Sequence, residues 1–85
     1  DYVTDFNINT LNLSNNSFND FPENIINMTT LTDVDLRFNV IDIIPNSVCT
    51  LLDNTLNPCT IHIQDNLIFD CNQIPDCNSG TINCE

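Results

Sequence analysis

Two stretches of the chain, 23 residues apart, carry the same pattern of residue types. Seven positions recur at this one offset, in the pairs Ile8/Leu31, Leu11/Val34, Leu13/Leu36, Asn16/Asn39, Phe18/Ile41, Phe21/Ile44 and Pro22/Pro45. A fixed period of roughly 20–30 residues is typical of stacked units that each supply one short strand and one return segment. The pattern therefore predicts parallel strands at equivalent positions of successive units.

The residue types within one unit explain this pattern. Leu11 and Leu13 alternate with polar residues, as a strand with one buried face requires. Asn39 follows the next strand where the chain must turn, and its amide can donate to and accept from the buried backbone groups of that turn. Because Asn16 and Asn66 lie at matching positions, we expect the three side chains to form an asparagine ladder.

A third unit is present in altered form. Ile61, Ile63 and Asn66 keep the strand and ladder positions, but Asn66 follows Asn39 by 27 residues, so four residues are inserted near 53–58. Beyond Ile68 the spacing dissolves into a tail that contains cysteines. We divide the chain into a preceding unit's end or N-terminal edge at 1–7, complete units at 8–30 and 31–53, an atypical last unit at 54–70, and a cysteine-bearing cap at 71–85.

From residue 8 to about 70 the pattern resembles that of extracellular leucine-rich-repeat proteins, and the tail is similar to their cysteine-bearing C-terminal flank. The tail departs from the common animal cap because it lacks a Trp and closely paired first cysteines. The resemblance implies an α/β solenoid with short parallel strands on a concave face and irregular or short helical return segments. It also implies that the concave sheet binds proteins or peptides.

Five cysteines lie in the C-terminal half: Cys49, Cys59, Cys71, Cys77 and Cys84. In so small a chain they favour a disulfide framework and an oxidising compartment, so we expect an extracellular protein, secreted or at the cell surface. Cys49 and Cys59 flank the insertion and are the preferred pair, with two of the other three forming a second. The odd cysteine is free or paired to another chain, and a reduced protein with buried thiols is the alternative.

Three acceptor motifs for N-linked glycans occur, at Asn12-Leu13-Ser14, Asn15-Asn16-Ser17 and Asn27-Met28-Thr29. Asn27 is the best candidate because it lies on a return segment, away from the strand face. A glycan on Asn12 would instead block the concave surface.

Charge excludes several functions. Twelve acidic residues stand against Arg37 alone, and a net charge of -11 argues against binding nucleic acid or anionic membranes. No apolar run is long enough for insertion into a membrane. The start at Asp1, without an initiator Met or an apolar signal segment, predicts a mature or excised piece.

No set of residues predicts an enzyme, a cofactor or a metal site. His62 lies one unit from Asp35 at the equivalent strand position, where the two are expected to make a surface contact. Cys59 is the cysteine nearest to this histidine, and a disulfide is its expected fate rather than catalysis. The segment 76–85 resembles a calcium loop, but its Gly comes one place early for an EF-hand and flanking helices are missing.

Function is therefore expected at surfaces. The candidates on the concave face are Asp33, Asp35, Arg37, His62 and Gln64. Tyr2, Val3 and Phe6 are candidates for an assembly edge, because the first strand lacks a visible cap and an uncapped edge pairs with another chain.

Two uses of such surfaces remain open. The first is a structural, self-assembling subunit that stacks head-to-tail on its own copies into a glycosylated filament. The alternative is the C-terminal fragment of a receptor-like or secreted recognition protein that binds a foreign protein or peptide.

Overall fold

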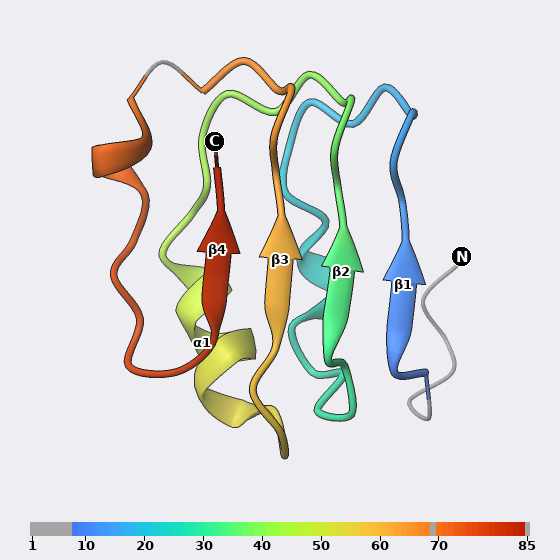
Figure 1. Cartoon of the computed structure of the whole chain (residues 1–85), viewed down its shortest axis with the longest axis vertical. Helices are drawn as coiled ribbons and strands as arrows, with labels where there is room; N and C mark the ends of the chain where they lie inside the picture. Colours follow the sequence, from blue (N-terminus) through green and yellow to red (C-terminus); the bar gives the residue numbers. More distant parts are fainter. Residues whose placement is uncertain (1–7, 69, 85) are drawn as a thin grey trace.

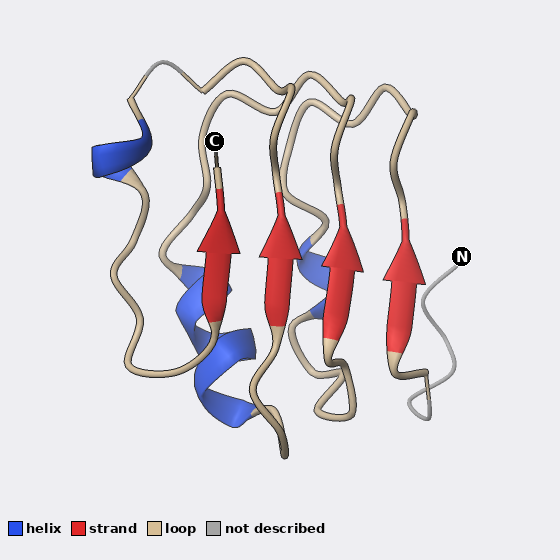
Figure 2. Ribbon diagram, viewed as in Figure 1, coloured by secondary structure: helices blue, strands red, loops and turns tan. Residues whose placement is uncertain are grey.

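The computed structural model of the chain describes residues 8–68 and 70–84, and its centre is a parallel β-sheet (Figure 1). Four strands pair in chain order: β1 (Thr10–Asn12), β2 (Asp33–Asp35), β3 (Thr60–His62) and β4 (Thr81–Asn83). The return segments hold the 3-10 helix η1 (Glu23–Ile25), the α-helix α1 (Ser47–Asn54) and the 3-10 helix η2 (Cys71–Gln73), coloured blue in Figure 2.

The register of the sheet places equivalent residues of successive strands side by side. The three rows are Thr10–Asp33–Thr60–Thr81, Leu11–Val34–Ile61–Ile82 and Asn12–Asp35–His62–Asn83. The middle row faces the core, and Val34 and Ile61 within it are fully buried. The predicted alignment of the first three strands is confirmed, because alternation with period 2 and a common spacing fix which residue lies beside which.

The predicted fold class, a leucine-rich-repeat solenoid, is wrong. The described residues form a small compact fold, 32 × 28 × 17 Å, with one four-stranded parallel sheet and one α-helix. Its return segments are unlike one another, since the first contains η1, the second contains α1, and the third contains η2 and is tied by disulfides. The sequence period therefore marks strands of a single sheet rather than an array of like structural units.

A single hydrophobic core fills the space between the sheet and the helical segments behind it. The fully buried residues of the return segments include Ile25, Met28, Val48 and Leu51. In α1 the buried side chains are Val48, Leu51 and Leu52, the i, i+3, i+4 spacing of an amphipathic helix. Each large aliphatic side chain removed from water in this way stabilises the fold by ~1.5–3 kcal/mol before conformational entropy is counted.

The turn after β2 is organised by one buried asparagine. Asn39 is only 5% exposed, and its Oδ1 accepts a hydrogen bond from the backbone N–H of Phe18 at 3.1 Å. Its Nδ2 donates to the carbonyl oxygens of Leu13, at 3.1 Å, and Leu36, at 2.9 Å. One amide thus satisfies backbone groups of two neighbouring turns, which would otherwise be buried without partners.

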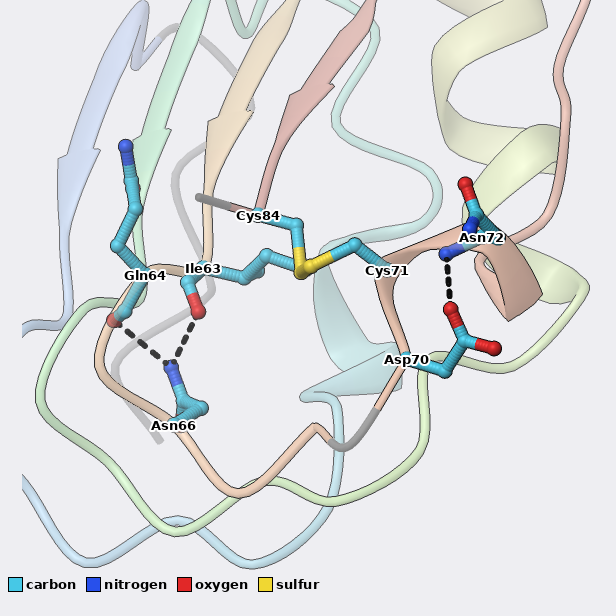
Figure 3. The surroundings of a disulfide bond; sticks show 7 residues. All are labelled: Ile63, Gln64, Asn66, Asp70, Cys71, Asn72 and Cys84. Atoms are coloured by element: carbon cyan, nitrogen blue, oxygen red, sulfur yellow. Dashed lines mark hydrogen bonds between the residues drawn. A yellow bond between two sulfur atoms is a disulfide. The ribbon is translucent and has the colours of Figure 1, made fainter.

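Asn66 repeats this arrangement in the next turn. Its Oδ1 accepts from the N–H of Ile41 at 3.0 Å, and its Nδ2 donates to the carbonyl oxygens of Leu36 and Ile63. Figure 3 shows the bond to Ile63. The exposed Asn16 donates to the carbonyl oxygen of Leu13. These bonds confirm the predicted asparagine ladder.

Two disulfides hold the C-terminal part. Cys49 on α1 pairs with Cys77, and Cys71 of η2 pairs with Cys84 just after β4, the bond drawn in Figure 3. The predicted pair of Cys49 with Cys59 is wrong. Cys59 is a free thiol, fully buried in the core immediately before β3, whereas Cys49 is only partly buried beside the C-terminal loop.

The segment 71–85, predicted to be a cysteine-bearing cap, contains β4, which pairs with β3. The turn that leads into β4 contains Gly80, whose φ of 78° lies in the left-handed region. Beside it the N–H of Ser79 is bound to the Asp53 carboxylate of α1 at 3.1 Å. The two disulfides, the turn at Gly80 and the bond to Asp53 together bring the C-terminal segment back alongside β3.

Candidate functional site

The exposed face of the sheet carries a tightly bound ion pair. Arg37 donates from Nε to Asp35 Oδ1 at 2.9 Å and from Nη2 to Oδ2 at 2.8 Å, a bidentate arrangement. Hydrogen bonding from Arg37 holds the pKa of the Asp35 carboxyl below its usual value, and Asp35 in turn raises the pKa of Arg37. The single Lys or Arg side chain of the protein is thereby neutralised locally.

His62 contacts a different acid from the one expected. Its Nε2 lies 2.9 Å from Oδ1 of Asp33, while its Nδ1 lies 3.4 Å from Nδ2 of Asn83. Asp35 is the neighbour in register, but its carboxylate is taken by Arg37. The predicted contact of His62 with Asp35 is therefore replaced by a diagonal one with Asp33.

Cys59 lies behind this face. Burial, with a smaller contribution from the Asp33 carboxylate, raises the pKa of its thiol to about 11. A thiol with such a pKa is protonated near neutral pH and is a poor nucleophile. Within residues 8–68 and 70–84, no group of three or more His, Cys, Asp or Glu side chains lies close enough together to hold a metal ion.

The two outer strands of the described sheet are alike in sequence. β1 is Thr-Leu-Asn and β4 is Thr-Ile-Asn, whereas the inner strands are Asp-Val-Asp and Thr-Ile-His. Carboxylates thus occur on the inner strand β2, and neither outer strand carries an acidic or basic side chain. Edge strands often carry charged side chains that prevent pairing with another chain. Neither outer strand of this sheet has that protection.

The sheet ends at β4 over an open depression of about 630 Å³. Apolar lining comes from Leu52, Ile74 and Ile82, and polar lining comes from residues that include Asn72, Asp76 and Asn83. The predicted assembly residues Tyr2, Val3 and Phe6 lie outside the described part of the chain.

All three candidate glycosylation residues are exposed. Asn12 lies on β1, where its Oδ1 accepts hydrogen bonds from the N–H and Oγ of Ser14. Asn15 lies in the following turn, and Asn27 follows η1 on a return segment. A glycan on Asn12 would stand on the outer strand of the sheet, whereas one on Asn27 would leave the strands accessible.

A second surface was missed at the level of sequence. Phe38, Val40, Ile43 and Leu67 are large apolar side chains that are exposed, and we call them the apolar edge. The sequence does contain a signal for this surface. At the 23-residue offset, Phe38, Val40 and Ile43 take the places of polar residues of the first unit. The apolar period reports core positions only, and these three residues lie outside it.

The comparisons with known proteins give no relative. No family model matches the chain, and no curated protein or solved structure is significantly similar to it. The resemblance to leucine-rich-repeat proteins gains no support from them. None of the helices in the described residues has the length and apolar character needed to cross a bilayer. The two disulfides are consistent with a secreted or extracellular protein.

Proposed function

We propose that this protein is a non-enzymatic, extracellular structural subunit that stacks head-to-tail on its own copies. In the stack, β4 of one copy pairs in parallel with β1 of the next. The observation that carries the proposal is the match between the two uncharged outer strands, Thr-Ile-Asn and Thr-Leu-Asn.

The sheet register supplies the pairing. Continued by one strand, it sets Thr81 beside Thr10, Ile82 beside Leu11 and Asn83 beside Asn12 of the next copy. Pairs of hydroxyl or amide side chains on the exposed face can exchange hydrogen bonds, and the apolar pair continues the buried row. None of these three described pairs sets a charge beside a like charge.

Such a contact joins two different surfaces, so it propagates along one direction unless the ring closes. Each copy carries a net charge of -11, and repulsion between copies opposes the stack at low salt. Assembly should therefore strengthen as added salt screens this repulsion, because the paired edges themselves are uncharged.

The test uses one blocked edge at a time. Thr10→Glu places a charge on the exposed β1 residue, and Thr81→Glu does the same on β4. Either variant alone should sediment as a monomer, because every contact needs one β1 and one β4. An equimolar mixture should give a one-to-one dimer, formed by the intact β4 of the first variant and the intact β1 of the second.

The matched control is Thr50→Glu, which adds the same charge at an exposed position of α1. It should assemble like the wild type, observed by sedimentation velocity and by electron microscopy as extended particles. A wild-type chain that stays monomeric at high concentration and high salt contradicts the proposal, as does a Thr10→Glu variant that assembles alone.

Recognition of a foreign protein through the exposed face is the second candidate. It is favoured by the Asp33 side chain, which is 48% exposed beside His62 and available to a basic partner. A chain with this function should remain a monomer until its ligand is added, and Asp33→Asn should weaken that binding without changing sedimentation.

A further inference from the structure

Exposed apolar side chains gather in one part of the molecule. Of the five large hydrophobic side chains exposed in the described residues, four form the apolar edge: Phe38 is 49% exposed, Val40 44%, Ile43 70% and Leu67 56%. The fifth, Leu56, lies apart in the loop before β3. Scattered exposed apolar residues are ordinary, but a group of them marks a binding surface.

Backbone hydrogen bonds between the two turns bring these residues together. The N–H of Leu67 donates to the carbonyl oxygen of Ile41 at 2.8 Å, and the N–H of Phe38 donates to that of Gln64 at 3.3 Å. Val40 and Leu67 each follow a ladder asparagine, so they occupy equivalent positions of adjacent turns. The apolar edge is thus a row across two neighbouring turns.

A depression of about 320 Å³ adjoins this row at Ile43. Ile44, Ile68 and Ile74 supply apolar walls, and Asp42 and Asp70 supply carboxylates at the same depression. Apolar surface beside carboxylates is the chemistry that accepts an amphipathic, positively charged segment.

Phe38 adds an independent observation. Its φ of 60° lies in the left-handed region. The equivalent positions of the two other turns have the same conformation and are occupied by Asn15 and Asp65, residue types that tolerate a positive φ. Phe is strained there, and about half of its surface remains in water. Among the described residues, neither backbone conformation nor packing accounts for a bulky aromatic residue at this position, whereas contact with a partner does.

We infer that the apolar edge and its depression dock a basic, amphipathic segment of a partner protein. An apolar side chain of that segment enters the depression beside Ile43, while its Lys or Arg side chains meet Asp42 and Asp70. Charge selects this partner over an anionic lipid surface, which Asp42 and Asp70 would repel. It also selects it over a second copy at this site, because the single Lys or Arg side chain of the protein, Arg37, is bound to Asp35 and does not offer a cation to Asp42 or Asp70.

The experiment measures binding of a short fluorescent peptide built of Leu and Lys, amphipathic as a helix, by fluorescence anisotropy. A second peptide with Ser in place of Leu keeps the charge and removes the apolar face. Ile43→Asp should weaken binding of the Leu–Lys peptide about tenfold or more. Leu56→Asp, the matched control at a 75% exposed residue, should leave it unchanged.

Equal binding of the two peptides, or equal loss in both variants, would show that net charge alone attracts the peptide and would overturn the inference. Reduced self-association of Ile43→Asp in sedimentation would overturn it as well, because the edge would then be an interface between copies. Thr10→Glu and Thr81→Glu should bind the Leu–Lys peptide like the wild type, so the docking site and the stacking contact are tested separately.

Discussion

The side-chain amide of Asn39 donates to the carbonyl oxygen of Leu13, a residue 26 positions earlier in the chain, at 3.1 Å. This bond joins the turn after β2 to the turn after β1, in addition to backbone hydrogen bonds such as that from the N–H of Asn15 to the carbonyl oxygen of Arg37 at 3.0 Å. Since Asn39 also accepts from Phe18, one buried side chain serves backbone groups in both turns. Asn39 therefore stabilises its own turn and also holds the preceding turn beside it.

Replacing Asn39 with Ala should lower the free energy of unfolding by about 1–3 kcal/mol, because buried backbone groups lose their partners. Asn16→Ala is the control, since Asn16 is exposed and its backbone contacts can be replaced by water. Thermal melts followed by circular dichroism measure both. Equal melting temperatures for the two variants would show that the buried amide is not a major support of the turns.

Gly80→Ala should destabilise the protein by about 1 kcal/mol or more. Gly80 has a φ of 78°, and an added Cβ would lie 2.7 Å from the carbonyl oxygen of Cys59, an oxygen that already accepts the N–H of Thr81 at 2.9 Å. The neighbouring Ser79→Ala changes only an exposed side chain and should be neutral. Urea denaturation at equilibrium would distinguish the two, and a neutral Gly80→Ala would contradict the described turn.

Phe38→Asn should raise stability by about 0.5–1 kcal/mol, because Asn tolerates the left-handed conformation that strains Phe. The same change should weaken docking of the Leu–Lys peptide, so stability and binding move in opposite directions. Asp65→Asn at the equivalent position is the control and should change stability little. A denaturation midpoint that falls in Phe38→Asn would mean that packing of the ring outweighs the strain.

Cys59 should resist alkylation in the native protein at mildly alkaline pH and react fully once the chain is unfolded. Burial raises the pKa of its thiol from 9.0 to about 11, so little thiolate exists in the fold below that pH. Stability from this group is present below pH 9 and is lost as the pH rises toward about 11, because only the unfolded chain ionises easily there.

The check is mass spectrometry of the unreduced protein after iodoacetamide treatment at several pH values. One slowly labelled thiol and two intact disulfides are expected, with Cys59→Ser as the control that takes up no label. Rapid labelling of the native chain would place Cys59 at the surface.

Sequence alone determined where the first three strands begin and which residues lie beside one another. Thr10, Asp33 and Thr60 could be aligned because alternation and spacing are local patterns that repeat along the chain. The role of Asn39 followed in the same way, since a turn after a buried strand needs a side chain that both donates and accepts.

Only the tertiary structure decided the rest. β4 forms because two disulfides, the turn at Gly80 and the bond from Ser79 to Asp53 bring the tail beside β3, and no local pattern reports such contacts. Disulfide partners depend on distances in the folded chain, which is why Cys49 pairs with Cys77 while Cys59 stays buried and free. Two further features depend on how unlike return segments pack on one core. They are the compact single sheet, which stands in place of the expected solenoid, and the apolar edge.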